Sequence, residues 1–353
     1  MFRFVLLFLL IISFNSSAEE NSKIFFEDWG SAKIDSLKWY SPRKKWGNGN
    51  NGVIPENLKF EKDTVFGKEK TVLSFYGNGD AYTGSLSGLN GNKARVGSML
   101  VSKRFFASGV YEIVFKIGDS EKGKPVGMIP AIWTYAYRFV KHSEDKYKKF
   151  DSKNPAYHPV LDKHKWGGCE YWSEIDFPEF GKNQELNKAL FNTFMNANFH
   201  SQIIPTPTVT DGKYHTMKMT WQTELIPIEI TDSQVAEDGG LWWVQDEKVK
   251  FENYRGNPLK RLGKDKYSVY AGKEVLYELD GKVIGRSTSF IPAMAAQLNL
   301  GVWFPEWGGK APWERAKMSI SSVKITPLNN SGDCFGFLVD DLKDNFDKSG
   351  NKK

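Results

Sequence analysis

The sequence lacks the features that define several large classes of protein. It contains no internal repeat and no sustained heptad pattern, which argues against a solenoid or a helical bundle. A glycine-rich phosphate loop and a Ser-His-Asp signature in an elbow context are also absent. The 48 Lys and Arg residues against 42 Asp and Glu give a mild formal net charge of +6, without a dense basic block. Nucleic-acid binding is therefore disfavoured.

Long apolar runs are scarce, and the one that stands out lies at the N-terminus. Arg3 precedes an apolar run over residues 4–14, and Ser16, Ser17 and Ala18 follow it. This order is typical of a secretory signal peptide, and the run is too short for a membrane span of about 20 residues. We expect residues 1–18 to be a signal peptide. The mature protein, beginning near Glu19, is then secreted (extracellular or periplasmic) and free of the membrane.

Cysteine and histidine are scarce as well. The chain has two cysteines, Cys169 and Cys334, and five histidines. In an exported protein the two cysteines either form one disulfide or remain two separate buried thiols, and the sequence leaves both open. Neither cysteine has other Cys or His ligands near it, so we predict no metal site and no cofactor.

Aromatic residues, in contrast, are abundant. They make up 14% of the chain, 12 of them are Trp, and 40% of all residues are hydrophobic. This composition is sufficient for a substantial core. Many tryptophans in a polar protein indicate either stacking on sugars or the filling of a large β core.

Three carboxylates lie within six residues: Glu174, Asp176 and Glu179. The residues between them are apolar, without Lys or Arg, and favour a strand. The alternation of a strand places Glu174 and Asp176 on one face. Glu179 reaches the same face if the strand contains one extra residue, a β-bulge, and Pro178 lies where a bulge is tolerated. The spacing therefore predicts three acids in a row on one face.

Such a row suits glycoside hydrolysis with retention, which needs a nucleophile and a protonated carboxyl roughly 5–5.5 Å apart. The backbone positions of Glu174 and Glu179 lie about 13 Å apart along a bulged strand, so their side chains must lean together. Asp176 would hydrogen-bond the nucleophile and separate the two pKa values. The pattern E-x-D-x-x-E alone occurs by chance in roughly one protein in ten of this length. Its position in an aromatic strand of an exported chain gives it weight.

Residues 174–179 (Glu-Ile-Asp-Phe-Pro-Glu) resemble the catalytic signature of glycoside hydrolase family 16, and the spacing is similar to that of laminarinases and agarases. The resemblance, which covers about residues 25–327, implies a concanavalin A-like jelly-roll β-sandwich of two antiparallel sheets with a concave cleft. It implies Glu174 as nucleophile, Glu179 as general acid/base and Asp176 as their helper. Ser173 replaces the usual Gly before the nucleophile. Ser321 stands where the family often has an Asp that helps bind structural calcium, which makes calcium doubtful.

The remaining pattern predicts one all-β domain over residues 19–327 and a C-terminal tail over 328–353. Insertions are expected near residues 135–168 and 245–270, where the pattern is rich in Lys, Tyr and turn residues. Residues 189–200 predict a single strand with Asn196, Asn198 and His200 on one face. Residues 274–284 predict a hairpin with Asp280-Gly281 at its turn.

Six further residues are candidates for substrate binding. The alternation over residues 295–303 directs Asn299 and Trp303 toward the cleft, while Leu298, Leu300 and Val302 enter the core. Residues 211–221 resemble a family block whose His reaches the cleft, although a structural His215 bonded to a carbonyl is nearly as well supported. Trp133 is either a sugar platform or a core residue. The complete set is Trp133, Trp172, His215, Asn299, Trp303 and Trp307.

The expected function is that of a secreted, monomeric, retaining endo-glycoside hydrolase acting on β-1,3- or mixed-linked glucan. One alternative is an agarase, porphyranase or carrageenase acting on a galactan, which the longer motif and the mild positive charge support. A second is a non-catalytic carbohydrate-binding protein on the same fold, which would be expected to have lost one of the three acids. The sequence leaves open the linkage, hydrolysis against transglycosylation, and the biological role.

Overall fold

The computed structural model describes residues 24–46, 50–118, 125–141, 168–196, 198–238, 240–244, 247–251, 253–254 and 257–335. The predicted signal peptide, most of the first predicted insertion and the end of the tail lie outside these residues. No helix in the described part of the chain combines the length and the apolar character that a membrane crossing requires.

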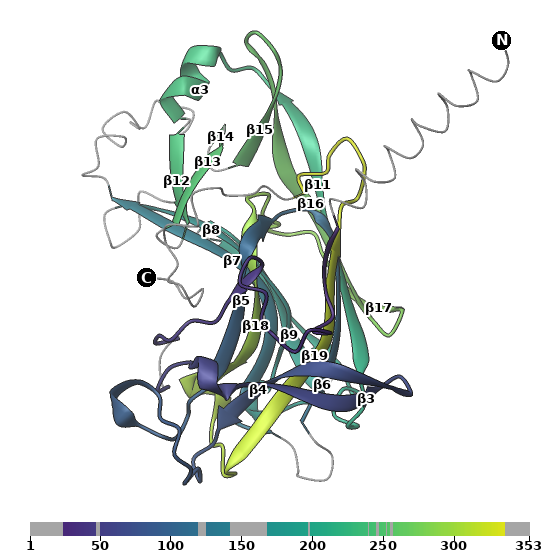
Figure 1. The fold of residues 1–353 in the computed structure, drawn as a ribbon. Coiled ribbons are helices and arrows are strands. Elements are labelled where there is room, and N and C mark those ends of the chain that lie inside the picture. Colours follow the sequence, from purple (N-terminus) through teal and green to yellow (C-terminus); the bar gives the residue numbers. More distant parts are fainter. Residues whose placement is uncertain are drawn as a thin grey trace, which may run out of the picture.

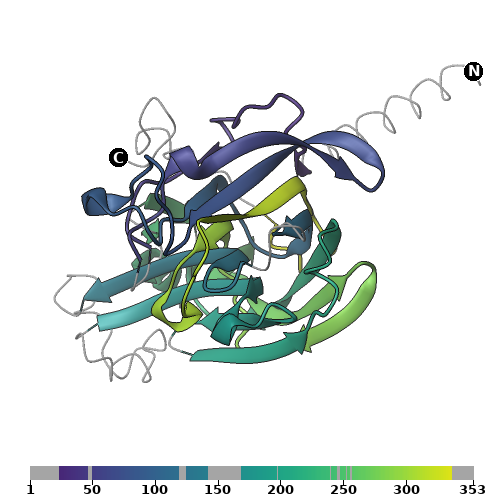
Figure 2. The same cartoon turned by 90° about the horizontal axis from the view of Figure 1, so that it is seen from below.

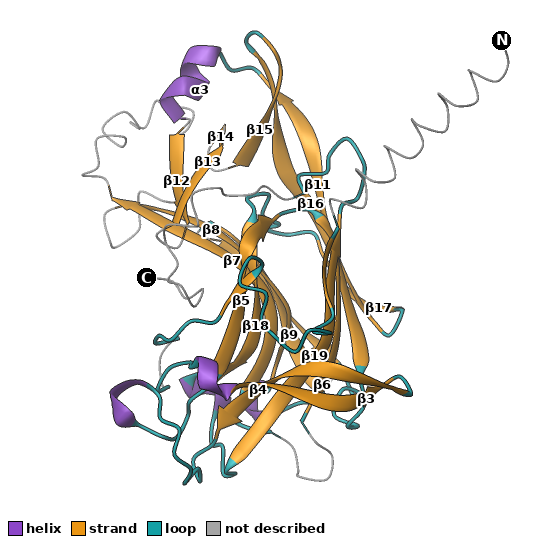
Figure 3. Ribbon diagram, viewed as in Figure 1, coloured by secondary structure: helices purple, strands orange, loops and turns teal. Residues whose placement is uncertain are grey.

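The structure is built almost entirely from strands (Figure 3). Seven strands form one sheet, in the spatial order β10 (Asn198–Pro205), β9 (Lys188–Met195), β8 (Gly168–Phe180), β7 (Ile129–Lys141), β18 (Ala296–Trp303), β5 (Ser98–Phe106) and β2 (Trp39–Tyr40). All these strand pairs are antiparallel.

The second sheet has ten strands. Eight of them lie in the order β14 (Asn253–Tyr254), β15 (Asn257–Gly263), β16 (Lys266–Leu279), β11 (His215–Ile228), β6 (Gly109–Ile117), β19 (Arg315–Thr326), β4 (Lys68–Asn78) and β3 (Leu58–Val65). The other two lie off this order: β1 (Phe25–Glu27) pairs with β19, and β17 (Lys282–Ser287) pairs with β16. The smaller elements are the hairpin β12 (Gly240–Val244) and β13 (Glu247–Phe251), the helix α3 (Asp232–Asp238), and the 3-10 turns η1 (Pro55–Asn57), η2 (Leu89–Gly91), η4 (Lys182–Gln184) and η5 (Glu306–Gly308).

The two sheets face each other across one apolar core (Figures 1 and 2). Alternate residues of β6 and β11 are buried, as expected for strands with one face in a core. Aromatic rings join the sheets: Tyr111 of β6 contacts Phe177 of β8 at 5.7 Å between ring centroids, and Phe115 of β6 stacks on Phe180 at 5.8 Å. The predicted antiparallel β-sandwich is confirmed. Because Phe177 and Phe180 fix the inner face of β8, its alternate residues face outward.

Residues 135–141, at the start of the first predicted insertion, continue strand β7, and residues 257–263 and 266–270 of the second belong to β15 and β16. The single strand predicted over residues 189–200 was wrong. Residues 189–200 form a hairpin of two strands, because Asn196 adopts a positive φ of 56° between β9 and β10. The predicted turn at Asp280-Gly281 is confirmed, with positive φ at both residues.

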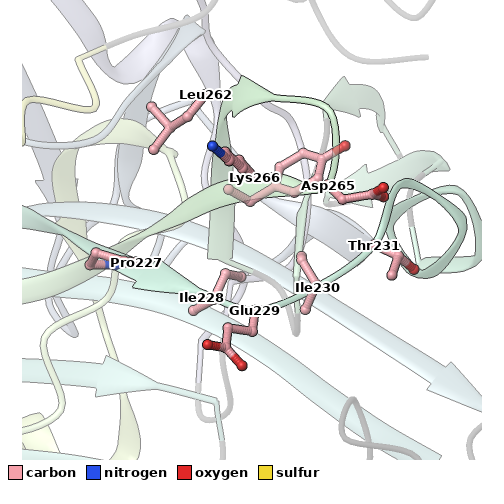
Figure 4. A pocket seen from close by; sticks show the side chains of 9 residues that line it. Pro227, Ile228, Glu229, Ile230, Thr231, Leu262, Asp265 and Lys266 are labelled. Carbon is pink, nitrogen blue, oxygen red and sulfur yellow. The ribbon is translucent and has the colours of Figure 1, made fainter.

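Strands β11 and β16 continue beyond the core toward β15 and α3, at the top of Figure 1. A cavity of about 450 Å³ lies there, between the segment that follows β11 and the β15–β16 turn (Figure 4). Ile228, Ile230, Leu262 and Tyr267 supply its apolar lining. None of the predicted site residues lines this cavity.

Candidate active site

The three acids lie on one face of β8, and a bulge places them there. On the β7 side, Ala131 pairs with Glu179 and Trp133 with Asp176, so three steps along β8 match two along β7. On the β9 side the ladder also gains one residue of β8 between Ile175 and Glu179. The predicted bulge is confirmed, and the peptide bond between Phe177 and Pro178 within it is cis. Glu174, Asp176 and Glu179 therefore share the outward face.

Each acid has a defined neighbourhood on this face. The indole Nε1 of Trp172 donates a hydrogen bond of 2.6 Å to Oε2 of Glu174. The amide Nδ2 of Asn192, from β9, donates one of 2.6 Å to Oδ2 of Asp176. Asp176 is buried, with 2% of its surface exposed, whereas Glu174 and Glu179 are partly exposed. The two outer acids are thus open to a ligand and the middle one is not.

Partial burial and mutual repulsion raise the pKa of both glutamates. Burial is the largest influence on Glu174, and the charges of Asp176 and Glu179 add to it, so its pKa lies well above its usual range despite the hydrogen bond from Trp172. Burial and the charge of Asp176 likewise hold the pKa of Glu179 well above its usual range. Both glutamates therefore hold their protons to a higher pH than isolated carboxyls do.

Asp176 has a smaller shift. Burial raises the pKa of Asp176 to about 6, while hydrogen bonds with Asn192 and Glu174 act in the opposite direction. Asp176 and Glu174 act on each other in opposite directions, because their interaction lowers the pKa of Asp176 and raises that of Glu174. The middle acid can thus adjust its charge as the charge on its neighbour changes.

The predicted tryptophans lie at different depths. Trp172 touches the acids directly, and Trp133 pairs with Asp176 in the ladder but is only 5% exposed, because Trp46 packs on it at 5.7 Å. Trp303 and Trp307 meet edge to face at 5.7 Å. The Trp303 Nε1 has no partner at full hydrogen-bond geometry among the described residues, yet its proximity lowers the pKa of Glu179. Trp307, 39% exposed, is the most accessible of them.

The side chain of Asn299 is not accessible to a ligand. It pairs with Trp133 in the ladder, on the outward face as predicted. Its side chain is completely buried, and its Nδ2 donates to the carbonyl oxygen of Gln297 at 3.0 Å. A direct contact between Asn299 and a ligand would require its cover to move.

The structure places His215 away from the acids. It lies on β11 in the ten-stranded sheet, is 5% exposed, and faces the core with Met217 and Met219. Its Nδ1 lies 2.7 Å from Oδ2 of Asp280, and its Nε2 lies 3.1 Å from Oδ1 of Asp211. Both ring nitrogens are therefore already bonded to the chain. The structure therefore does not bring His215 to the acids, and these contacts favour its alternative structural role, with carboxylates as partners in place of a carbonyl.

The structure brings to this face five further residues that are not among the predicted site residues. Tyr135 of β7 pairs with Glu174, which itself pairs with Phe194 of β9. The alternation of β7 can be seen in the sequence, and it places Tyr137 on the same outward face as Tyr135. Asn192 and Phe194 follow the alternation of β9, whereas Phe199 reaches this face only because the chain turns between β9 and β10. The five residues are Tyr135, Tyr137, Asn192, Phe194 and Phe199.

The described residues show only part of the predicted metal and cysteine chemistry. No group of three or more His, Cys, Asp and Glu side chains there is arranged to hold a metal ion. Cys334 is a free thiol, and burial raises its pKa to about 12, with a smaller contribution from Asp333. The side chain of Cys169 lies outside the described residues.

The fold and the site together define a β-sandwich with three carboxylates on the outward face of one sheet, two of them partly exposed. No protein-family model matches the sequence, and no curated protein matches it. Three similar solved structures are a lichenase from a mouse hindgut metagenome (17% identity, 87% of this chain and all of that one, TM-score 0.49), a Bacillus licheniformis β-glucanase (16%, 86% and 97%, 0.48), and LamAcat of Zobellia galactanivorans (15%, 88% and 99%, 0.49). Because these scores lie just below 0.5 at low identity, the functional assignment rests on the site itself.

Proposed function

We propose that the protein is a retaining endo-glycoside hydrolase of the family 16 type, acting on a β-linked glucan. The observation that supports this most strongly is the position of three carboxylates with raised pKa values on one face of a bulged strand. Retaining glycosidases need one carboxylate as a nucleophile and one protonated carboxyl as an acid. The two partly exposed groups, Glu174 and Glu179, meet this requirement.

In the first step, the carboxylate of Glu174 attacks the anomeric carbon and displaces the oxygen of the leaving sugar. Glu179, protonated because its pKa is raised, gives its proton to that oxygen as the glycosidic bond breaks. The Trp172 indole hydrogen bond stabilises the anionic form of Glu174. The pKa of Asp176, raised to about 6, lets the middle acid take up a proton more readily than an isolated carboxyl does, which weakens its repulsion of the Glu174 carboxylate.

In the second step, Glu179 is a carboxylate and acts as a base. It removes a proton from a water molecule, whose oxygen attacks the anomeric carbon of the glycosyl ester on Glu174. The ester bond breaks, Glu174 leaves as a carboxylate, and Glu179 regains its proton. Two displacements at the same carbon give net retention of configuration.

The side chains around the acids favour a neutral glucan over a sulfated galactan. A sulfated chain would be expected to bind Arg or Lys side chains. Lys188 of β9 forms an ion pair with Glu185 at 2.7 Å, and Lys182 follows the catalytic strand in η4. The outward residues beside the acids on β7, β9 and β18 are instead aromatic, aliphatic or amide: Trp133, Tyr135, Leu190, Asn192, Phe194, Gln297 and Asn299.

The proposal includes export, because residues 1–18 have the pattern of a signal peptide. It also includes action as a monomer. Both are tested by mass spectrometry of the mature N-terminus and by light scattering of the purified protein.

The function is tested by incubating the protein with laminarin, lichenan, agarose, porphyran and carrageenans and analysing the products. We expect oligosaccharides from laminarin or lichenan, with the β-anomer formed first in proton NMR spectra. The variant Glu174→Gln should lose this activity, whereas Glu69→Gln, an exposed change on β4, should retain it. Oligosaccharides released only from a sulfated galactan would contradict the proposed β-glucan substrate. Activity that persists in Glu174→Gln would overturn the mechanism.

A further inference from the structure

A continuous aromatic row leads away from the acids across the free edge of the seven-stranded sheet. Trp172 of β8 stacks on Phe194 of β9, with centroids 4.6 Å apart and planes 10° apart. Phe194 in turn stacks on Phe199 of β10 at 5.6 Å and 25°. We call these three residues the aromatic row. Its first member donates the hydrogen bond to Glu174, so the row is continuous with the proposed site.

The far end of the aromatic row is exposed. Phe199 has 61% of its surface exposed, and Ile203, on the same face of β10, has 55%. Strand β10 ends the order of the sheet, so no further strand in the described residues pairs with its outer edge. Burying such an apolar ring against a ligand would be favourable, by about 25 cal/mol for each Å² removed from water.

The dimensions and chemistry of the row fit a sugar chain. Adjacent strands lie about 4.8 Å apart, so the backbone of Phe199 lies roughly 10 Å from that of Glu174, across the strands. A polysaccharide cleaved at Glu174 can therefore continue over β9 and β10. Pyranose rings have flat faces of C–H groups, which pack against aromatic rings while the hydroxyls remain in water. Phenylalanine rings contribute apolar contact and no charge, which favours an uncharged sugar.

We infer that Phe199, supported from behind by Phe194, forms an additional sugar-binding platform, which holds an uncharged pyranose unit beyond the cleavage site. This inference rests on the proposed function and deepens it, because it makes binding depend on chain length. Short substrates that contact only the acids gain nothing from the platform. Long chains gain one further stacked ring.

The test compares Phe199→Ala with Phe66→Ala. Phe66 is a matched control, because it is 62% exposed in the β3–β4 turn of the other sheet. We expect Phe199→Ala to raise the KM for laminarin or lichenan roughly 3- to 10-fold, the range of one aromatic contact. Its kcat and its activity on an aryl β-glycoside of one or two glucose units should stay unchanged. Phe199→Trp should restore the KM, and Phe66→Ala should match the wild type.

Affinity electrophoresis in gels containing each polymer provides a readout that needs no turnover. If Phe199→Ala loses retardation while the wild type hydrolyses nothing, the platform stands and the proposed function fails. If Phe199→Ala hydrolyses and binds every polymer as the wild type does, the platform is overturned and the proposed function stands. A change in oligomeric state on light scattering, with unchanged polymer binding, would also overturn it, because the row would then bind a second copy of the chain.

Discussion

The outward faces of the two sheets both contain carboxylates, but their surroundings are opposite. On the ten-stranded sheet, Glu61 accepts hydrogen bonds from Lys317 at 2.7 Å and from Tyr76 at 2.6 Å. Burial alone would raise the pKa of Glu61, but these partners, with Ser74, lower it. Asp63 is held in the same way by Lys116 and Tyr214. On the seven-stranded sheet, burial raises the pKa of all three acids, and neighbouring acids raise the pKa of the two glutamates further, although the charge of Lys182 opposes this at Glu179.

The difference shows which face is organised for stability and which for chemistry. Neutralised pairs such as Glu61 and Lys317 lower the energy of the folded state and have little reason to react. Three carboxylates in contact cost stability at neutral pH, because like charges are held together. This loss of stability occurs on β8, where two of the three carboxylates are open to a ligand. Perturbed pKa values of this kind are typical of catalytic sites.

The largest expected effect is that of Glu179→Gln. The amide keeps the size of the side chain but has no acidic proton to give to the leaving oxygen. We expect kcat/KM on the polymer to fall by about 10²–10⁴-fold, measured by reducing-end release. The corresponding change on the other sheet, Glu61→Gln, should leave kcat/KM within twofold. Equal losses in the two variants would remove the functional distinction between the faces.

The second effect is on stability. Asp176→Asn should raise the free energy of unfolding at pH 7 by about 1–3 kcal/mol. The pKa of Asp176 in the folded state, about 6, exceeds its ordinary value of 3.8, so folding favours the protonated form. Its ionisation therefore reduces stability as pH rises from about 4 through 6. The amide oxygen of the variant can still accept the hydrogen bond from Asn192. Urea unfolding at pH 7 and pH 4 measures this, and the gain should disappear at pH 4.

A third, smaller effect tests the hydrogen bond to the nucleophile. Trp172→Phe keeps a ring to stack on Phe194 but removes the donor to Glu174. The pKa of Glu174 should then rise further, and the acidic limb of the plot of kcat/KM against pH should move upward by up to about one pH unit. An unchanged acidic limb would show that Trp172 does not tune the nucleophile.

The smallest expected effect is a loss of stability, opposite in sign to the gain expected for Asp176→Asn. Glu61→Gln should lower the free energy of unfolding at pH 7 by up to about 1 kcal/mol, because a partly exposed ion pair contributes little. The folded-state pKa of Glu61 is lowered, so its contribution is present above its unfolded pKa of about 4.5 and disappears as pH falls through the folded value. Urea unfolding of Glu61→Gln at pH 7 and pH 3 measures it. A variant more stable than the wild type at pH 7 would contradict the contrast between the faces.

Local patterns in the sequence were sufficient to predict much of the fold and the centre of the site. The alternation of β6, β11 and β18, the Asp280-Gly281 turn and the bulge at Pro178 all follow from rules that act over a few residues. The face shared by the three acids followed from the same rules.

What could not be predicted depends on pairing between distant segments. Trp46, in a loop near the N-terminus, packs on Trp133 of β7. No local sequence pattern shows this contact. The position of His215 required knowing which sheet β11 joins and that Asp280, 65 residues away, bonds its ring. Phe199 could have been found, had the positive φ favoured by Asn196 been taken as a turn.

The bulge in β8 also determines how the chain can change length. Within a regular strand, the loss of one residue exchanges the two faces of everything that follows. Here, deleting one residue between Asp176 and Glu179 would remove the bulge and restore plain alternation. All three acids would remain outward and Phe180 would remain in the core. The separation of the outer acids along the strand would shorten by about 3.3 Å. A one-residue deletion at the bulge therefore keeps the three acids on one face, whereas a one-residue insertion does not. The spacing of the outer acids along β8 can become shorter but not longer.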